Sequence, residues 1–442
     1  MGGESADEVS TDGESTARAY SEGEVRTVAL AVIAGVFFGG VATGVAFPTL
    51  PLLDDLLGIS AVMLGIILSA NRFSRLPMNA PAGTVVDSVG ARRPMIAGLF
   101  VQGLAPFGYV LGLHVPAGTF VVAPGIGAVS NAAAVFLVAR MAWGVGSAFV
   151  FIGAFTTVTS VTTEGNRGRW LGYMRGGQSL GFPTGLVVGG VVSDLVSFEA
   201  AFLLAGVLAG FAGFVGYRVL PDVRPETDGR TRLRDIPGMI RREPRVLPIG
   251  VGNATLRFVF GGVLLATVAK YAEATGATIS VLEATGISGV VLAVGVLSAS
   301  GATLVAGRVS DGLSNRAVLL FPTMSAIAVG LTVLAFLPTL AGMFLGTALV
   351  GAGTGGSGPT LLAILGDITP GDEVGRMGGV YNVLGDVGLT LGPLAAVPMV
   401  DVWFGFETTY AICAGVVVLA LLVSAVPLLD GRGLSLPLLR SS

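Results

Sequence analysis

Six ionisable side chains interrupt long apolar stretches of this sequence, and they are the residues best placed to do chemistry. Five are arginines and one is a carboxylate: Arg72, Arg75, Arg140, Arg175, Arg257 and Asp386. A charge inside a bilayer is costly unless it is paired or faces water, so such charges mark substrate or ion pathways. Arginine recognises anions, and a carboxylate can take up and release a proton. The pattern predicts a site that handles charge.

Three of these charges fall near the middle of their apolar segments when about 1.5 Å is allowed per helical residue: Arg72, Arg257 and Asp386. Arg257 and Asp386 could pair, and pairing would make the burial of both tolerable. Arg72 has no evident acidic partner.

The remaining candidates for binding a ligand are polar residues on the same segments. They are Arg140, Asn71, Gln178, Asn253 and Asn382. For the amides the alternative is hydrogen bonding between helices. For Arg140 the alternative is extension to the outer surface.

The composition indicates a polytopic membrane protein. The chain has 442 residues, of which 52% are hydrophobic and 12% are charged, whereas soluble proteins carry roughly 25% charged residues. The single cysteine, Cys413, and the single histidine, His114, argue against an intrachain disulfide and against a cysteine or histidine metal site. We expect no metal and no cofactor.

Twelve segments are apolar over the roughly 20 residues that a membrane-spanning helix needs. Only helices satisfy their own backbone in lipid at these lengths, so the predicted class is all-α. The spans are Thr27–Leu50, Ala61–Ala82, Pro94–Leu113, Ala132–Val158, Trp170–Val192, Ala200–Tyr217, Leu247–Ala269, Ile287–Ala306, Ala317–Leu337, Leu340–Leu365, Met377–Val400 and Thr408–Leu428.

The basic residues are distributed asymmetrically about these spans. Of the 25 Lys and Arg residues, 19 fall on one side, Lys270 alone falls on the other, and five lie within spans. Basic residues near spans stay in the cytoplasm, so both termini are predicted to be cytoplasmic in a plasma-membrane protein. The predicted organisation is a disordered acidic tail (1–24), a six-helix bundle (25–217), a linker (218–246), a second six-helix bundle (247–429) and a tail (430–442).

The two predicted bundles resemble each other. Arg169, Gly172, Gly181 and Gly185 recur as Arg376, Gly379, Gly388 and Gly392 at a constant offset. The segment 83–93 after the second span has a weaker copy at 307–316 after the eighth. Halves related by an internal repeat place a substrate site at the midplane between them.

The segment 83–93, GTVVDSVGARR, resembles the signature loop of the major facilitator superfamily through Gly83, Asp87, Gly90, Arg92 and Arg93. The glycines permit a tight turn between spans. The resemblance implies that Asp87 docks at the start of the eleventh helix, at Arg376, and latches one conformation, with Asp311 as its counterpart. Ser88 stands where the family prefers a basic residue. The alternative is a helix cap flanked by arginines that fix topology.

Two further motifs are similar to those of this family. Arg140 precedes Gly144 and Gly146 in the fourth span, and Gly181, Pro183 and Gly185 in the fifth resemble the glycine–proline motif of exporters, although Phe182 separates Gly181 from Pro183. The expected role of these glycines is close packing, with a thin, bendable fifth helix between the two bundles.

The resemblance implies a secondary transporter of the drug-efflux, twelve-helix type that works by alternating access. The expected activity is proton-coupled export of a small organic molecule, powered by a proton or other ion gradient. We expect a monomer in the lipid bilayer, with no enzymatic activity and no nucleic-acid partner. Two alternatives remain: an organic-anion carrier, working by symport or exchange through a positive cavity, and a non-transporting membrane sensor on the same scaffold.

Overall fold

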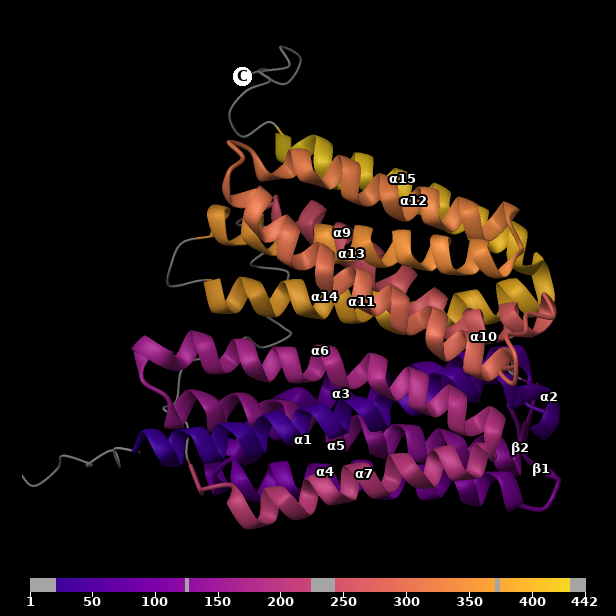
Figure 1. Cartoon of the computed structure of the whole chain (residues 1–442), viewed down its shortest axis with the longest axis horizontal. Coiled ribbons are helices and arrows are strands. Elements are labelled where there is room, and N and C mark those ends of the chain that lie inside the picture. The colour runs from indigo at the N-terminus through magenta and orange to yellow at the C-terminus, as the bar shows by residue number, and fades with distance from the viewer. Residues whose placement is uncertain (1–20, 124–126, 224–242, 370–373, 430–442) are drawn as a thin grey trace, which may run out of the picture.

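The computed structural model describes residues 21–123, 127–223, 243–369 and 374–429, and these residues are almost entirely helical (Figure 1). The long helices are α1 (Glu22–Thr49), α3 (Ala61–Val89), α4 (Arg92–His114), α5 (Asn131–Val161), α6 (Glu164–Leu195), α7 (Phe198–Val219), α9 (Val246–Arg257), α10 (Leu265–Ala274), α11 (Ala284–Asp311), α12 (Leu320–Phe336), α13 (Leu340–Ile368), α14 (Val374–Pro398) and α15 (Gly405–Leu429). A π-helical turn, Phe258–Leu264, joins α9 to α10, and another, Met399–Trp403, continues α14.

The short elements lie between long helices. They are the 3-10 turns Leu50–Leu52 and Arg316–Leu319, helix α2 (Asp54–Leu57), and the antiparallel strands β1 (Thr119–Ala123) and β2 (Gly127–Ser130), in which Thr119 pairs with Ser130. Ten helical segments in the described part of the chain are long and apolar enough to cross a membrane. Helices α3 and α6 are not among them, because they carry the polar residues considered below.

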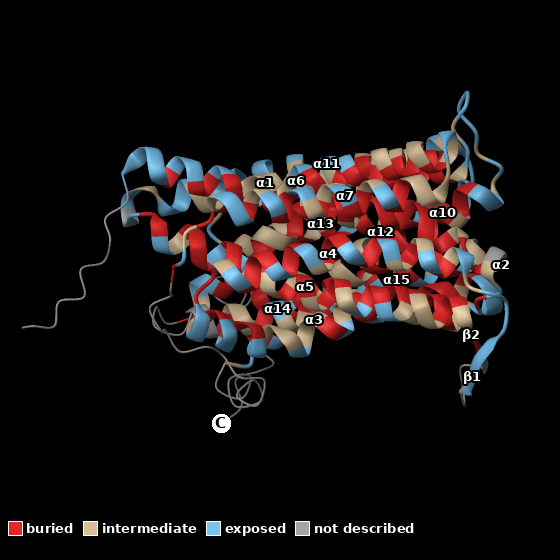
Figure 2. Ribbon diagram, turned by 90° about the horizontal axis from the view of Figure 1, so that it is seen from below, coloured by how far each residue is buried: buried red, intermediate tan, exposed pale blue. Residues whose placement is uncertain are grey.

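The helices form two groups that lie side by side (Figure 1): α1 and α3–α7, here the N-terminal group, and α9–α15, the C-terminal group. We call the end of the molecule that carries α2, β1, β2 and α10 the hairpin end. The opposite end, where α1 begins and α7 ends, is the linker end. Across the groups α3 packs against α14, and α6 packs against α11. Buried residues fill the interior of both groups, whereas exposed residues cover the outer faces and the ends (Figure 2).

Helix α1 begins inside the predicted N-terminal tail, at Glu22 rather than after residue 24. Ser21 explains the difference because it forms a capping box: its hydroxyl accepts from the Glu24 N–H, and the Glu24 carboxylate accepts from the Ser21 N–H at 2.9 Å. Such a cap contributes roughly 1 kcal/mol. The rest of that predicted tail, the middle of the predicted linker and the predicted C-terminal tail lie outside the described residues.

The prediction that Gly83 and Asp87 belong to a loop is wrong, because α3 continues to Val89. A helix can extend beyond its apolar segment once water solvates its side chains, and the end of the apolar run marked only the edge of the membrane. The turn itself is confined to Gly90 and Ala91. Gly90 has φ +85°, and the Ala91 N–H donates to the carbonyl of Val223.

The two groups are packed together at the hairpin end and separate toward the linker end. Leu186 and Gly190 of α6 lie against α11, where a side chain at Gly289 would collide with Leu186. Gly172 lies on the same face of α6, nearer the linker end. Leu304 lies on the corresponding face of α11, because residues a whole number of helical turns apart share a face. No described residue lies within 4 Å of a Cβ placed at Gly172, and Leu304 is 69% exposed. The conformation is therefore open at the linker end.

Candidate functional site

The carboxylate of Asp386 joins the two groups near the middle of the molecule. On its own side, Arg257 Nη1 of α9 donates to Asp386 Oδ1 at 2.8 Å. From the opposite group, Arg75 Nη2 of α3 lies 3.3 Å from Oδ2 and 3.4 Å from Oδ1. The Asp386 side chain is buried. One carboxylate thus holds a guanidinium from each group.

The sequence predicted the pairing of Arg257 with Asp386 but not the role of Arg75. Arg75 was recognised as a charge within a span, and its position along α3 gave its depth but not the direction it faces. Arg257 is further oriented by Asn382, whose Oδ1 accepts from Nη2 at 3.0 Å. Gly385 leaves room for this arrangement, because a Cβ there would collide with Asn253 and Arg257.

Arg72 lies one helical turn before Arg75 and is close enough to Asp386, Arg75 and Arg257 to interact with all three electrostatically. Among the described residues it makes no hydrogen bond and no ion pair. Two guanidinium groups thus contact the carboxylate, and a third, that of Arg72, lies within electrostatic range of it.

Water has access to this cluster. The side chain of Arg257 is 31% exposed, and Asn382 is exposed. An arginine twelve residues into a helical span cannot present a third of its surface to hydrocarbon at acceptable cost, so the exposed side faces an aqueous space.

Arg140 occupies a different environment. It is only 1% exposed, and it donates from Nε and Nη2 to the backbone carbonyls of Ile67 and Leu68 at 3.3 and 3.0 Å. Its guanidinium also lies 5.5 Å from the centre of the Phe47 ring. The alternative of extension to the outer surface is excluded. Arg140 fastens α5 to α3 in the N-terminal group.

The predicted amides divide into two kinds. Asn253 is buried and donates to the Tyr381 carbonyl at 2.7 Å, which is the interhelical role given as the alternative. Asn71 is buried where α3 meets α5. Gln178 is exposed on α6, and Asn382 belongs to the charged cluster.

The predicted packing glycines all face neighbouring helices. A Cβ at Gly144 would collide with Asn71 and Ser74 of α3, and one at Gly146 with Gly98 of α4. Gly181 and Gly185 lie against Phe37 and Val41 of α1. Gly181 and Gly185 pack α6 within its own group, and Gly190 of the same helix faces α11 of the other group, so α6 lies at the boundary between the two groups. Pro183 lies inside continuous α6.

At the linker end, the predicted latch residues lie near the ends of four helices, α3, α4, α11 and α14. Arg92 donates to the Tyr217 carbonyl at 2.8 Å, which ties α4 to α7, and Arg93 is exposed. Asp311 pairs with Arg316 at 3.1 Å within its own loop. Asp87 is half-buried in the last turn of α3. Arg376 lies in the first turn of α14, but its side chain is outside the described residues.

The sequence did not predict the ionic contacts at the hairpin end. Lys270 of α10 pairs with Asp54 of the N-terminal group and, at 2.9 Å, with Asp401 of its own group. Asp194 of α6 accepts from the N–H groups of Glu283 and Gly286, at 2.7 and 2.8 Å, where α11 begins. The sequence does contain an indication of this contact, because Lys270 is the one basic residue outside the spans on its side of the predicted membrane.

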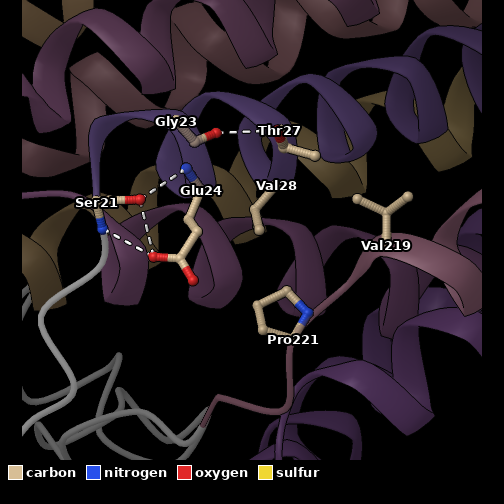
Figure 3. Close-up of a pocket in the computed structure, with 7 residues that line it drawn as sticks. All are labelled: Ser21, Gly23, Glu24, Thr27, Val28, Val219 and Pro221. Carbon is tan, nitrogen blue, oxygen red and sulfur yellow. Dashed lines mark hydrogen bonds between the residues drawn. The ribbon is translucent and has the colours of Figure 1, made fainter.

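A separate pocket lies at the linker end beside the start of α1 (Figure 3). Its lining includes Ser21, which precedes α1, Glu24 and Thr27 of α1, and, at the end of α7, Val219 and the following Pro221. The Glu24 carboxylate there is engaged with Ser21. The pocket lies within one group and far along the helices from Asp386, so we do not assign it to the charged cluster.

A family model, the Major Facilitator Superfamily, matches residues 32–320 and 246–434. The chain therefore belongs to this superfamily and is a multi-pass membrane transporter rather than an enzyme. The tetracycline resistance protein, class G, of Vibrio anguillarum is 27% identical over 88% of this chain and 92% of that protein. Multidrug resistance protein 2 of Bacillus subtilis is 24% identical, and the match spans 45% of each chain, less than half the length of that relative.

Solved structures support the fold. A bacterial homologue of the human lysosomal transporter Spinster, in an inward-facing and occupied conformation, aligns with a TM-score of 0.69 at 14% identity over 93% of this chain and 96% of that chain. A D-xylose–proton symporter aligns with a TM-score of 0.70 at 16% identity, covering 93% of this chain and all of that chain.

Proposed function

We propose that this protein is a secondary active transporter that exports a small organic molecule by alternating access and is coupled to protons through Asp386. In this proposal twelve helices span the plasma membrane as two pseudo-symmetric bundles with both termini in the cytoplasm, and the monomer is the working unit. The linker end is then the cytoplasmic end, and the described conformation is inward-open. The division of the chain at the 218–246 linker is part of the same proposal.

The observation that carries the proposal is the double engagement of Asp386. Arg257 belongs to the same group as Asp386, so a rigid rotation of the two groups leaves that pair intact. Arg75 belongs to the other group, so the same rotation breaks the Arg75–Asp386 pair. Protonation of Asp386 removes the charge that holds Arg75. A proton would in this way favour the change between the two access states.

The direction of transport rests on the relatives. Those named for resistance to tetracycline and to multiple drugs favour export, because resistance of this kind requires a compound to leave the cell. Their identities of 24–27% do not transfer a substrate.

The experiment is transport in proteoliposomes under an imposed pH gradient, with tetracycline, ethidium and benzoate as probes of three charge types. The proposal expects proton-dependent movement of at least one probe and its loss when the gradient is collapsed. Equal movement with and without the gradient for every probe that is transported would contradict proton coupling.

A second candidate, an organic-anion carrier, is favoured by the excess of arginines over carboxylates in the cluster. A cation is repelled strongly by like charges in a region of low dielectric constant. On this candidate, benzoate is transported and ethidium is not.

The proposed topology makes a direct prediction. With Cys413 replaced by Ser, a single cysteine introduced into the 218–245 segment should resist membrane-impermeant thiol reagents in intact cells. A cysteine at Val122, which is 71% exposed on β1 at the hairpin end, serves as the exposed comparison. Labelling of both at the same rate would overturn the orientation.

The proposed latch also makes a prediction. Asp87 lies in the last turn of α3, where an acid is unfavourable for its own helix dipole, so Asp87→Asn should leave the fold intact. If Asp87 stabilises one access state through the start of α14, its loss shifts the equilibrium by about 1 kcal/mol, and transport slows several-fold while substrate affinity is retained. Wild-type transport rates with Asp87→Asn would show that the segment only fixes topology. Ser88→Ala is the matched control.

A further inference from the structure

We infer that Arg72, Arg75 and Arg257 form a binding site for a carboxylate-like anionic group of the substrate, and that ionised Asp386 is its internal competitor. Proton uptake by Asp386 and anion binding would then promote each other. The inference rests on the second candidate of the proposed function, the organic-anion carrier, and deepens it by naming the anionic group that the site binds and the sign of its coupling to protons.

The charge count of the cluster supports an anionic ligand. Three guanidinium groups lie within electrostatic range of one carboxylate, and Arg72 makes no ion pair within the described part of the chain. Arginines do not lose their proton at physiological pH. The cluster therefore carries about two uncompensated positive charges at mid-depth, and an anion from the aqueous space is the natural counter-charge.

The hydrogen-bond geometry shows where an anion would enter. Each guanidinium has five N–H donors in a planar fork suited to carboxylates. Arg75 uses only Nη2, over long distances of 3.3 and 3.4 Å, and Arg72 uses none among the described residues. Arg257 is fixed by Asp386 and Asn382. Arg72 and Arg75 thus offer unused donors beside an oriented third guanidinium.

The coupling follows from competition for the same donors. Ionised Asp386 already occupies Arg75 and Arg257, and a protonated Asp386 releases them to another anion. The charged or titratable groups near it on the packed helices are Arg72, Arg75 and Arg257, with buried Tyr381 on its own helix. By linkage, protons raise the affinity for the anion, and the anion raises the affinity for the proton by the same factor. Anion and proton would then travel together, whereas antiport requires each to exclude the other.

The test uses purified full-length protein in lipid-free detergent, with benzoate as the anion and benzamide as its neutral isostere. Binding is followed by the rise in the melting temperature at constant ionic strength, because a ligand of the native state stabilises it. We expect Asp386→Asn, which lacks the competing negative charge, to bind benzoate about tenfold more tightly than the wild type, and benzamide to bind both proteins equally. Weaker benzoate binding by Asp386→Asn than by the wild type, or equal behaviour of the two probes, would overturn the inference.

Two variants and one control sharpen the test. Asp386→Asn imitates the protonated acid, so it frees Arg75 and Arg257 to bind the anion. Arg72→Gln, which removes no described contact, should weaken benzoate binding about tenfold in the wild type and in Asp386→Asn. Arg308 is exposed at the end of α11, so the control Arg308→Gln should leave the binding of benzoate and of benzamide unchanged. Benzoate affinity unaltered by Arg72→Gln would remove Arg72 from the site.

The inference and the proposed function can fail separately. Proton-driven transport of a neutral solute with no anion binding would refute the anion site and leave the transporter intact. Tighter benzoate binding by Asp386→Asn without proton-driven transport of any probe would support the site and refute the proposed coupling.

Discussion

Replacement of Asp386 by Asn is expected to abolish accumulation driven by a pH gradient while substrate exchange without a gradient continues. The amide keeps the size of the side chain but can neither take up a proton nor hold Arg75 by charge. Because the Arg75–Asp386 contact joins the two groups of helices, its loss removes the step in which the proton controls their rotation. Gradient-driven accumulation should fall at least about tenfold, to the level of protein-free liposomes.

The measurement compares gradient-driven uptake and equilibrium exchange in the same proteoliposomes. The control is Glu273→Gln, an equivalent acid-to-amide change at an exposed residue. Retained exchange separates a role in coupling from a structural role, in which expression and both activities are lost together. Unchanged gradient-driven transport by Asp386→Asn would remove this residue from the mechanism.

Replacement of Lys270 by Ala is expected to weaken closure of the hairpin end. Lys270 is largely buried and lies between Asp54 and Asp401, so its removal leaves two carboxylates facing each other across the two groups. Removing one partner from a buried ionic contact costs on the order of 3 kcal/mol. The conformation that is closed at this end should therefore lose population by more than tenfold.

A cysteine at Ala266 reports this change. Ala266 is 1% exposed and packs against residues of the N-terminal group, so it should react slowly with N-ethylmaleimide until the hairpin end opens. In a Cys413→Ser background, Lys270→Ala should accelerate labelling, and Lys270→Arg, which keeps the charge, should largely preserve protection. Equal labelling in all three proteins would show that the ionic contact does not hold this end closed.

Much of the helical framework could be predicted from the sequence because apolar runs of membrane length have one structural solution in lipid. The ends of the helices could not be predicted in this way. Asp87 continues α3 beyond its apolar run, and Ser21 begins α1 before its own. In both cases local hydrogen bonding, to water or to a capping side chain, decides where the helix ends. The hydropathy of the sequence carries no information about these hydrogen bonds.

The site was predicted in part for a similar reason. The position of a charge along a helix gives its depth, so Arg257 and Asp386 could be matched. The direction that each charge faces depends on how the helices rotate and cross, which the sequence does not give. For this reason it could not be predicted that Arg140 is buried against α3 whereas Arg75 reaches Asp386. The helix against which Gly181 and Gly185 pack could not be predicted for the same reason, because it depends on the rotation of α6 about its own axis.

The central claim is that protonation of Asp386 releases Arg75 and lets the two groups rotate. Electron–electron spin distances between labels at Gly172 on α6 and Leu304 on α11 test it most directly, because both positions lie on the faces that separate toward the linker end. We predict that Asp386→Asn, which carries no charge to hold Arg75, shifts the distribution toward shorter distances than in the wild type, and that Glu273→Gln leaves it unchanged. Distributions that are the same in Asp386→Asn and in the wild type would contradict the account.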